Sequence, residues 1–169
     1  MDFGAVQCTP QSPNCLFCPL SGSCRALSEG KVQQLPVKQH RTKTTSRYFN
    51  YIYVRMGAHT LIHKRTEDDI WKNLFELPLV ETEKDLSEEE FLACPQFHAL
   101  FAEGEVRMVR TLLRGVKHVL SHRVIYTNFY EVTLPDNSSS FSSYQRVAVE
   151  DLGRYAVPRL IHAFLEKYV

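Results

Sequence analysis

The chain has 169 residues, of which 44% are hydrophobic, and its formal net charge is +1. That length holds one well-packed domain and an appendage but hardly two full domains. No run of eighteen apolar residues occurs, which argues against a membrane-spanning helix. The first residues also lack the charged and then apolar pattern of a signal peptide, so secretion is not expected.

Four of the five cysteines stand close together near the start of the chain, at Cys8, Cys15, Cys18 and Cys24. The spacing C-x6-C-x2-C-x5-C puts four thiolates on a short segment, which suits either tetrahedral zinc or an iron–sulfur cluster. Structural zinc sites usually carry two C-x2-C pairs, whereas here only Cys15 and Cys18 form one. Disulfide scaffolds spread their cysteines through the chain, so the sequence favours a metal centre in a reducing, cytoplasmic setting.

The first 26 residues, MDFGAVQCTPQSPNCLFCPLSGSCRA, resemble the cluster segment of helix-hairpin-helix DNA glycosylases related to endonuclease III. Within that group the resemblance is to adenine glycosylases of the MutY type. It implies that the four cysteines bind a [4Fe-4S] cluster, with zinc as the less favoured occupant. It also implies that residues 1–27 are the end of a helical catalytic domain that is absent. Relatives often carry Lys or Arg between the first two cysteines, whereas residues 9–14 carry no charge.

A basic, polar stretch follows the cysteines and predicts an interdomain connector over residues 28–46. From Arg25 to Arg47 the chain holds six Lys or Arg residues against the single acid Glu29. The segment LPVKQHRTKTTSRYF is similar to the linker between the two halves of MutY-type glycosylases. Such a connector is either solvated or placed to neutralise DNA phosphates.

Residues 47–169 predict a compact α+β domain. Residues 48–54 are β-branched and aromatic and predict a strand buried on both faces, with residues 60–63 as its partner after a turn at Gly57. Residues 74–80 predict a third strand, interrupted by Pro78. Residues 116–134 predict two further strands, the second over 124–130, followed by a polar serine-rich loop over 136–143.

Two helices are expected in the same domain. Ser87 and Glu90 have the spacing of a capping box, so a helix begins there and stops before Pro95. A second helix begins at Pro158. Its apolar stripe consists of Leu160, Ile161, Phe164, Leu165 and Tyr168.

This domain is similar to a Nudix fold at residues 63–65, at residues 70–78 and at Glu81. MutY-type glycosylases carry a Nudix-like domain that helps to recognise 8-oxoguanine. The fold implied is a mixed sheet with packed helices, preceded by the cysteine-rich loop and the basic connector. The stretch Val119-Leu120-Ser121-His122-Arg123 resembles the loop that reads the lesion, which implies that Leu120, Ser121, His122 and Arg123 recognise 8-oxoguanine and DNA.

A working Nudix hydrolase is the main alternative, in the form of a free-standing nucleotide hydrolase with a zinc-binding appendage. Hydrolysis needs several carboxylates on one helix to hold magnesium. Leu79 and Val80 stand where the signature has glycines, and no Arg-Glu-x-x-Glu-Glu follows. Glu88, Glu89 and Glu90 are consecutive on a helix and point in different directions. A small zinc-dependent DNA-binding module is a third alternative.

The remaining signals concern DNA and chemistry. Residues 67–90 hold ten acids and two lysines, whereas residues 107–123 hold five basic residues and no acid, which predicts a positive face.

Adenine removal needs an acid to protonate the leaving base and a carboxylate to stabilise the cationic sugar. No Asp or Glu stands in a matching motif, and no catalytic residue is assigned. We therefore expect a monomeric, bacterial, cytoplasmic protein whose partners are duplex DNA with 8-oxoguanine opposite adenine and the missing helical domain, with no membrane.

Overall fold

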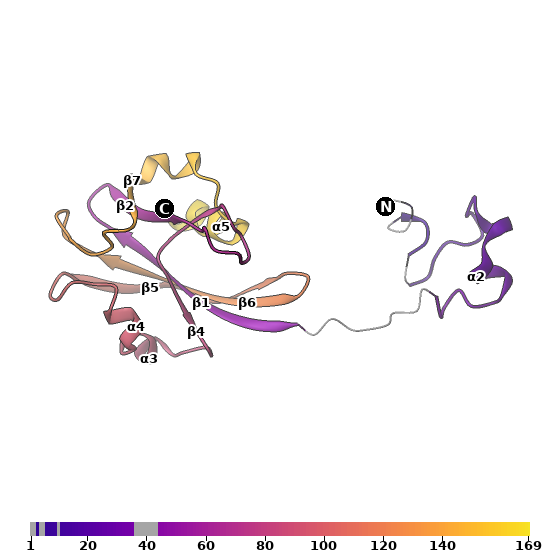
Figure 1. Ribbon diagram of the computed structural model, residues 1–169, viewed down its shortest axis with the longest axis horizontal. Helices are drawn as coiled ribbons and strands as arrows, with labels where there is room; N and C mark the ends of the chain where they lie inside the picture. The colour runs from indigo at the N-terminus through magenta and orange to yellow at the C-terminus, as the bar shows by residue number, and fades with distance from the viewer. Residues whose placement is uncertain (1–2, 4–5, 10, 36–43) are drawn as a thin grey trace. The chain divides into compact units, whose positions relative to one another are not determined.

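The computed structural model describes residues 3, 6–9, 11–35 and 44–169 (Figure 1). The chain divides into two compact units, Met1–Lys43 and Thr44–Val169. The predicted connector over 28–46 lies partly outside the described residues, as do residues 1–2, 4–5 and 10 of the cysteine segment. No helix in the described part of the chain is long and apolar enough to cross a membrane.

The first unit consists of short helical turns and loops around the cysteines. Its elements are η1 (Ser21–Ser23) and α2 (Arg25–Ser28), with Cys24 at the boundary between them. Helix α2 ends at Gly30, whose φ of +67° lies in the left-handed region that favours glycine. The amide of Lys31 then donates to the carbonyl of Ala26, which closes the helix end.

The second unit is built on a mixed, four-stranded sheet, in agreement with the predicted fold class. Its strands are β4 (Leu79–Thr82), β1 (Thr45–Arg55), β6 (Arg123–Thr133) and β5 (Met108–Val119), in that spatial order. Strand β1 runs parallel to β6 and antiparallel to β4, while β5 and β6 form an antiparallel hairpin. Both central strands are longer than the sequence predicted.

A second, three-stranded sheet corrects two predictions. It consists of β3 (Phe75–Glu76), β2 (His59–Lys64) and β7 (Gln145–Ala148), in the order β3-β2-β7. The prediction that residues 60–63 pair with the first strand is wrong, because β2 pairs with β3 and β7 instead, and the bridge between Met56 and His59 lies just beyond the end of β1. The single strand predicted over 74–80 is also wrong, because the chain passes from one sheet to the other at Leu77 and Pro78.

Helices cover both faces of the four-stranded sheet, as the both-face burial of β1 predicted (Figure 1). Phe49, Tyr51 and Tyr53 face the core that contains α5 (Arg159–Tyr168). Ile52 and Val54 face the opposite core, which contains α3 (Glu88–Leu92) and α4 (Pro95–His98). Strand β6 joins the two cores because its neighbouring residues Phe129 and Tyr130 stack on Phe164 and Phe91 respectively.

The helix starts follow the predicted capping chemistry. Ser87 accepts from the amide of Glu90 while the Glu90 carboxylate accepts from the amide of Ser87, so the capping box is confirmed. Pro95 opens α4 rather than only ending the helix before it. Pro158 is the N-cap of α5 rather than its first residue, so the helix begins one residue later than predicted, and the short helix η2 (Val149–Arg154) precedes it.

The serine-rich loop over 136–143 is fastened by one carboxylate. Glu105 accepts hydrogen bonds from the hydroxyls of Ser138 and Ser140 and, at 2.9 Å, from the amide of Ser139. These bonds lower the pKa of Glu105 to about 2. Phe141 is buried beside Tyr144 behind this loop, with a φ of 61°. The loop is therefore an ordered part of the domain.

Candidate nucleic-acid interface and cysteine centre

The four cysteines of the first unit line the same small cavity, together with side chains that include Pro13 and Leu27. Successive backbone turns bring them there: the amide of Cys18 donates to the carbonyl of Cys15, and that of Ser21 to the carbonyl of Cys18. Gln7 closes the segment by donating to the carbonyl of Asn14. The structure therefore places all four predicted ligands along one cavity.

All five cysteines carry free thiols, and the four in the cavity are the donor set that iron–sulfur clusters and zinc use. Within the described ranges no three His, Cys, Asp or Glu side chains are arranged to hold a single metal ion. Cys94 belongs to the second unit, where it is the N-cap of α4 and packs against the core that contains Phe91 and Phe97. The cavity therefore brings together thiols of the type that a thiolate-bound centre uses, although among the described residues their arrangement is not that of a metal site.

The predicted reading loop is the tight turn between β5 and β6. The amide of Leu120 donates to the carbonyl of Arg123 at 2.8 Å, which closes the turn. Leu120 packs against the core that contains Phe129, whereas Ser121 and His122 are exposed at the tip. Ser121 is exposed, and its hydroxyl makes no hydrogen bond to the described residues, so it is free to donate or to accept.

A carboxylate that the sequence reasoning missed holds this turn. Asp69 accepts a short hydrogen bond from Arg123 with one oxygen. With the other oxygen it accepts from Arg47 at 2.6 Å and from Arg65 at 3.1 Å. Partial burial raises the pKa of Asp69, but the hydrogen bonds from Arg47 and Arg123 outweigh it and lower the pKa to about 2. Asp69 therefore stays ionised between three arginines.

The network around Asp69 continues into the buried part of the sheet. Arg65 donates to both oxygens of Glu76, at 2.8 and 2.7 Å, and Tyr51 donates its hydroxyl to Glu76 at 3.0 Å. Burial and the Glu76 carboxylate raise the pKa of Tyr51 well above its usual range. Arg47 binds Glu81 through two hydrogen bonds of 2.6 Å. Arginines therefore neutralise the carboxylates on either side of Pro78.

The three consecutive acids of the predicted helix do not form a site. Glu90 is part of the capping box and also pairs with Lys84 at 3.7 Å. Glu88 and Glu89 occupy the first turn of α3, where negative charge stabilises the helix end. Nothing in the described part of the chain assembles them into a magnesium site.

The basic residues of 107–123 do not share one face, contrary to the predicted positive face. Arg110 reaches Glu131 at 3.2 Å on the side of α5, whereas Arg114 donates to the carbonyl of Leu86 on the side of α3. Strand β5 changes register near Gly115, whose φ is +68°, and this irregularity separates them. Arg123 is engaged by Asp69, whereas Arg107, Arg110, Arg114 and Lys117 are all exposed.

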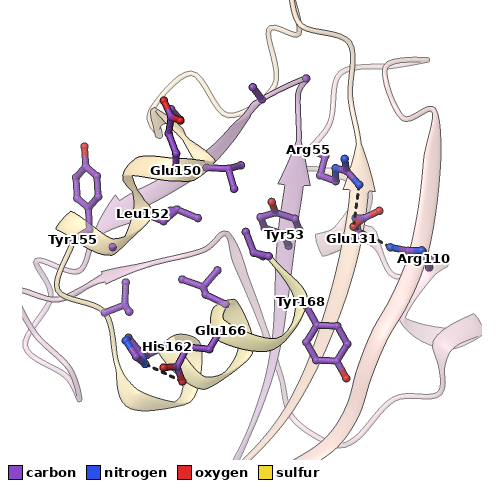
Figure 2. A pocket seen from close by; sticks show the side chains of 18 residues that line it. Tyr53, Arg55, Arg110, Glu131, Glu150, Leu152, Tyr155, His162, Glu166 and Tyr168 are labelled. Carbon is purple, nitrogen blue, oxygen red and sulfur yellow. Dashed lines mark hydrogen bonds and ion pairs between the residues drawn. The ribbon is translucent and has the colours of Figure 1, made fainter.

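A cavity of about 820 Å³, which no sequence pattern indicated, lies between α5, η2 and the sheet (Figure 2). Buried Glu131 lies at one end, between Arg55 and Arg110. Tyr53 lies at the floor, and Tyr168 lies on the helix side (Figure 2). The cavity lies on the face of the sheet that α5 covers, away from the engaged arginines around Asp69.

Comparison with known families decides the assignment of the second unit. Residues 50–167 match the NUDIX domain family. The chain belongs to that family. The predicted Nudix-like fold is confirmed, and the family match runs from within β1 to the last but one residue of α5.

Curated relatives carry the name adenine DNA glycosylase. That of Buchnera aphidicola subsp. Schizaphis graminum is 35% identical over 82 residues, which cover 48% of this chain and 24% of the relative. That of Buchnera aphidicola subsp. Acyrthosiphon pisum is 26% identical over 171 residues, covering 99% of this chain and 46% of the relative. The chain therefore spans less than half of each of these relatives, and the predicted resemblance to MutY-type glycosylases is confirmed.

Solved structures share the fold of the Nudix domain. The C-terminal domain of mouse MUTYH, determined in complex with human PCNA, superimposes with a TM-score of 0.53 at 15% identity, covering 66% of this chain and 79% of that chain. A MutT protein, from a study of the Aliivibrio salmonicida and Vibrio cholerae enzymes, gives a TM-score of 0.50 at 16% identity, covering 72% of this chain and 95% of that chain. At these identities the likeness concerns the fold alone.

Proposed function

We propose that this chain is the recognition part of an adenine DNA glycosylase, an N-glycosyl hydrolase that removes adenine paired with 8-oxoguanine in base excision repair. One observation carries the proposal. The turn predicted to read the lesion presents Ser121 and His122, both exposed, at the tip of a hairpin in a chain whose curated relatives are adenine DNA glycosylases. This chain binds the DNA and recognises the lesion, and a helical catalytic domain removes the adenine.

The hydrogen-bonding pattern of the lesion suits a hydroxyl at the turn. 8-Oxoguanine differs from guanine in having an oxygen at C8 and a proton on N7, so an acceptor becomes a donor. The Ser121 hydroxyl can accept from that N7–H, whereas with guanine it has to rotate and donate. His122 contacts the lesion strand, Leu120 holds the turn against the core, and Arg123 anchors its end.

We propose further that Cys8, Cys15, Cys18 and Cys24 hold a [4Fe-4S] cluster. The shared cavity and the free thiols support a thiolate-bound centre, and the resemblance of the segment to MutY-type glycosylases favours the cluster over zinc. The cluster supplies a structural cross-link between the turns of this segment. The partners are duplex DNA containing 8-oxoguanine opposite adenine and the helical catalytic domain, in a DNA-associated, cytoplasmic setting.

A nucleotide hydrolase receives less support from the same residues. Glu76 and Glu81 are paired with Arg65 and Arg47, so they are poor ligands for magnesium. No Asp or Glu stands in a catalytic motif of the glycosylase family either. The chain by itself is therefore expected to release no adenine from DNA and to leave nucleoside triphosphates intact in the presence of magnesium.

The test is the affinity of the chain for two labelled duplexes that differ only in 8-oxoguanine or guanine opposite adenine, measured by fluorescence anisotropy at low salt. Tighter binding of the 8-oxoguanine duplex is expected. One neutral hydrogen bond contributes about 1 kcal/mol, so Ser121→Ala alone lowers the preference only modestly, and Ser121→Ala with His122→Ala lowers it further. Ser143→Ala with His98→Ala changes exposed residues elsewhere and serves as the matched control.

Equal affinity of the wild-type chain for both duplexes would contradict the proposal. Equal losses on both duplexes in the double variant would mean that the turn only holds the DNA backbone.

A further inference from the structure

We propose that Asp69 is a positioning residue for the turn Leu120–Arg123, and that the loop 67–73 clamps the β5–β6 hairpin so that Ser121 and His122 are presented in one geometry. This inference rests on the proposed function of the turn. It concerns a loop whose Asp69 lies 54 residues before Arg123 at the end of the turn.

The first support is the way Asp69 divides its two oxygens between separate elements. Its Oδ1 accepts from Nη1 of Arg123, the residue that ends the turn and begins β6. Its Oδ2 accepts from Nη1 of Arg47 in β1 at 2.6 Å and from Nη2 of Arg65 at 3.1 Å. A carboxylate bound on both oxygens cannot rotate freely. It therefore fixes the guanidinium of Arg123 relative to β1.

The second support is that the loop contacts both strands of the hairpin. Trp71, two residues after Asp69, lies against His118 of β5 with ring centroids 5.9 Å apart. Trp71 also packs edge-on against Phe49 of β1 at 6.1 Å, which ties the loop to the core. Trp71 and Asn73 have φ values of 60° and 69°. Residues other than glycine adopt this conformation only where their surroundings hold it.

The third support is the backbone of the turn itself. The amide of Thr45 donates to the carbonyl of His122 at 3.2 Å, and Thr45 is the register partner of Arg123. The turn is therefore held at its backbone by β1 and at its last side chain by Asp69. The side chains at its tip, Ser121 and His122, are left exposed. A turn with a fixed backbone holds the exposed Ser121 hydroxyl in one position, which it needs to distinguish an N7 donor from an N7 acceptor.

The test compares Asp69→Asn with Asp68→Asn, the neighbouring carboxylate, whose side chain is 98% exposed and pairs only with Lys72. Amide hydrogen exchange at Leu120 and Thr45 reports the two hydrogen bonds that close and dock the turn. We expect exchange at both amides to rise at least tenfold in Asp69→Asn and to stay unchanged in Asp68→Asn. Arg123→Gln should give the same result, and the double variant should be no worse than either single variant.

The second measurement is the ratio of the affinities for the 8-oxoguanine and guanine duplexes, taken where every variant is folded. We expect Asp69→Asn to reduce that ratio several-fold, Asp69→Glu to restore part of it, and Asp68→Asn to keep it. A residue that only stabilises the fold would lower the midpoint of thermal unfolding and leave the ratio unchanged. If Asp69→Asn does not fold, Arg123→Gln answers the same question, because Asp69 then still pairs with Arg47 and Arg65.

The two measurements distinguish failure of this inference from failure of the proposed function. Unchanged exchange at Leu120 and Thr45 in Asp69→Asn would overturn the inference, and so would faster exchange with an unchanged affinity ratio. A wild-type chain that does not distinguish the duplexes would overturn the proposed function. In that case the exchange data alone decide whether Asp69 positions the turn.

Discussion

Phe129 of β6 and Phe164 of α5 stack face to face, with ring centroids 4.1 Å apart and ring planes 3° apart. Both side chains are buried, and Phe164 also stacks on Tyr168 at the end of the helix. The pair is the centre of the contact between α5 and the four-stranded sheet. Helix α5 has ten residues, which is too short to be stable alone in water, so this packing maintains it.

Truncating the helix partner of this stack should therefore destabilise the whole domain. We expect Phe164→Ala to lower the free energy of unfolding by about 3–5 kcal/mol, because a large buried ring is replaced by a cavity. Urea denaturation followed by circular dichroism measures the change. His162→Ala, on the exposed side of the same helix, should cost less than about 0.5 kcal/mol. A loss below 1 kcal/mol for Phe164→Ala would show that α5 is not held by this stack.

Acid stability should depend on Asp69. Its pKa is about 2 in the folded protein and near 3.8 when it is unperturbed. The lowered pKa contributes stability that is fully present above pH 3.8 and is lost as the pH falls toward 2. We expect the difference in unfolding free energy between the wild type and Asp69→Asn to shrink over this range. Asp68→Asn should follow the wild-type curve, and a difference that grows on acidification would contradict the assigned pKa.

The serine-rich loop should open when its carboxylate anchor is neutralised. Glu105→Gln removes the charged acceptor shared by Ser138, Ser139 and Ser140, so the loop should release Phe141 from the core. Chymotrypsin cleavage after Phe141 is expected to accelerate at least fivefold. Glu103→Gln, an exposed change two residues away, serves as the control. Equal cleavage of the two variants would mean that Phe141 is held by its aromatic neighbours alone.

The cysteine cavity gives a direct metal prediction. Chain purified without oxygen from iron-replete cells should contain iron and inorganic sulfide and absorb broadly in the visible range. Cys15→Ser, Cys18→Ser or Cys24→Ser should lower the content of both elements, whereas Cys94→Ser, which lies in the other unit, should not. Stoichiometric zinc with no sulfide would contradict the cluster and assign the cysteines to a zinc site.

The sequence predicted those elements whose signal is local. The run of aromatic and β-branched residues around Tyr51 predicted a strand buried on both faces, and the stripe containing Ile161 and Phe164 predicted the face of α5. Ser87 and Glu90 specify a helix start through contacts three residues apart. The clustering of four cysteines indicated a metal centre by itself, whereas the choice of an iron–sulfur cluster and the role of the turn at Ser121 came from resemblance to a family.

The features that were missed depend on partners far apart in the chain. Strand β2 pairs with β3 and β7 rather than with β1, and no local pattern encodes that choice. Asp69 lies 54 residues from Arg123, within an acidic run that has the appearance of a solvated surface. The separation of Arg110 from Arg114 depends on a bulge in β5, which a charge count does not detect.

The parallel pairing of β1 and β6 also determines how the Nudix domain bears mechanical load. The chain enters this domain at Thr45, and β1 then runs beside β6 through eleven paired positions, with β4 on its other edge. A pull applied along β1 from its start would load these hydrogen bonds together in shear, rather than breaking them one after another. The amide of Thr45 also donates to the carbonyl of His122, so tension applied at Thr45 would be transmitted directly to the turn between β5 and β6.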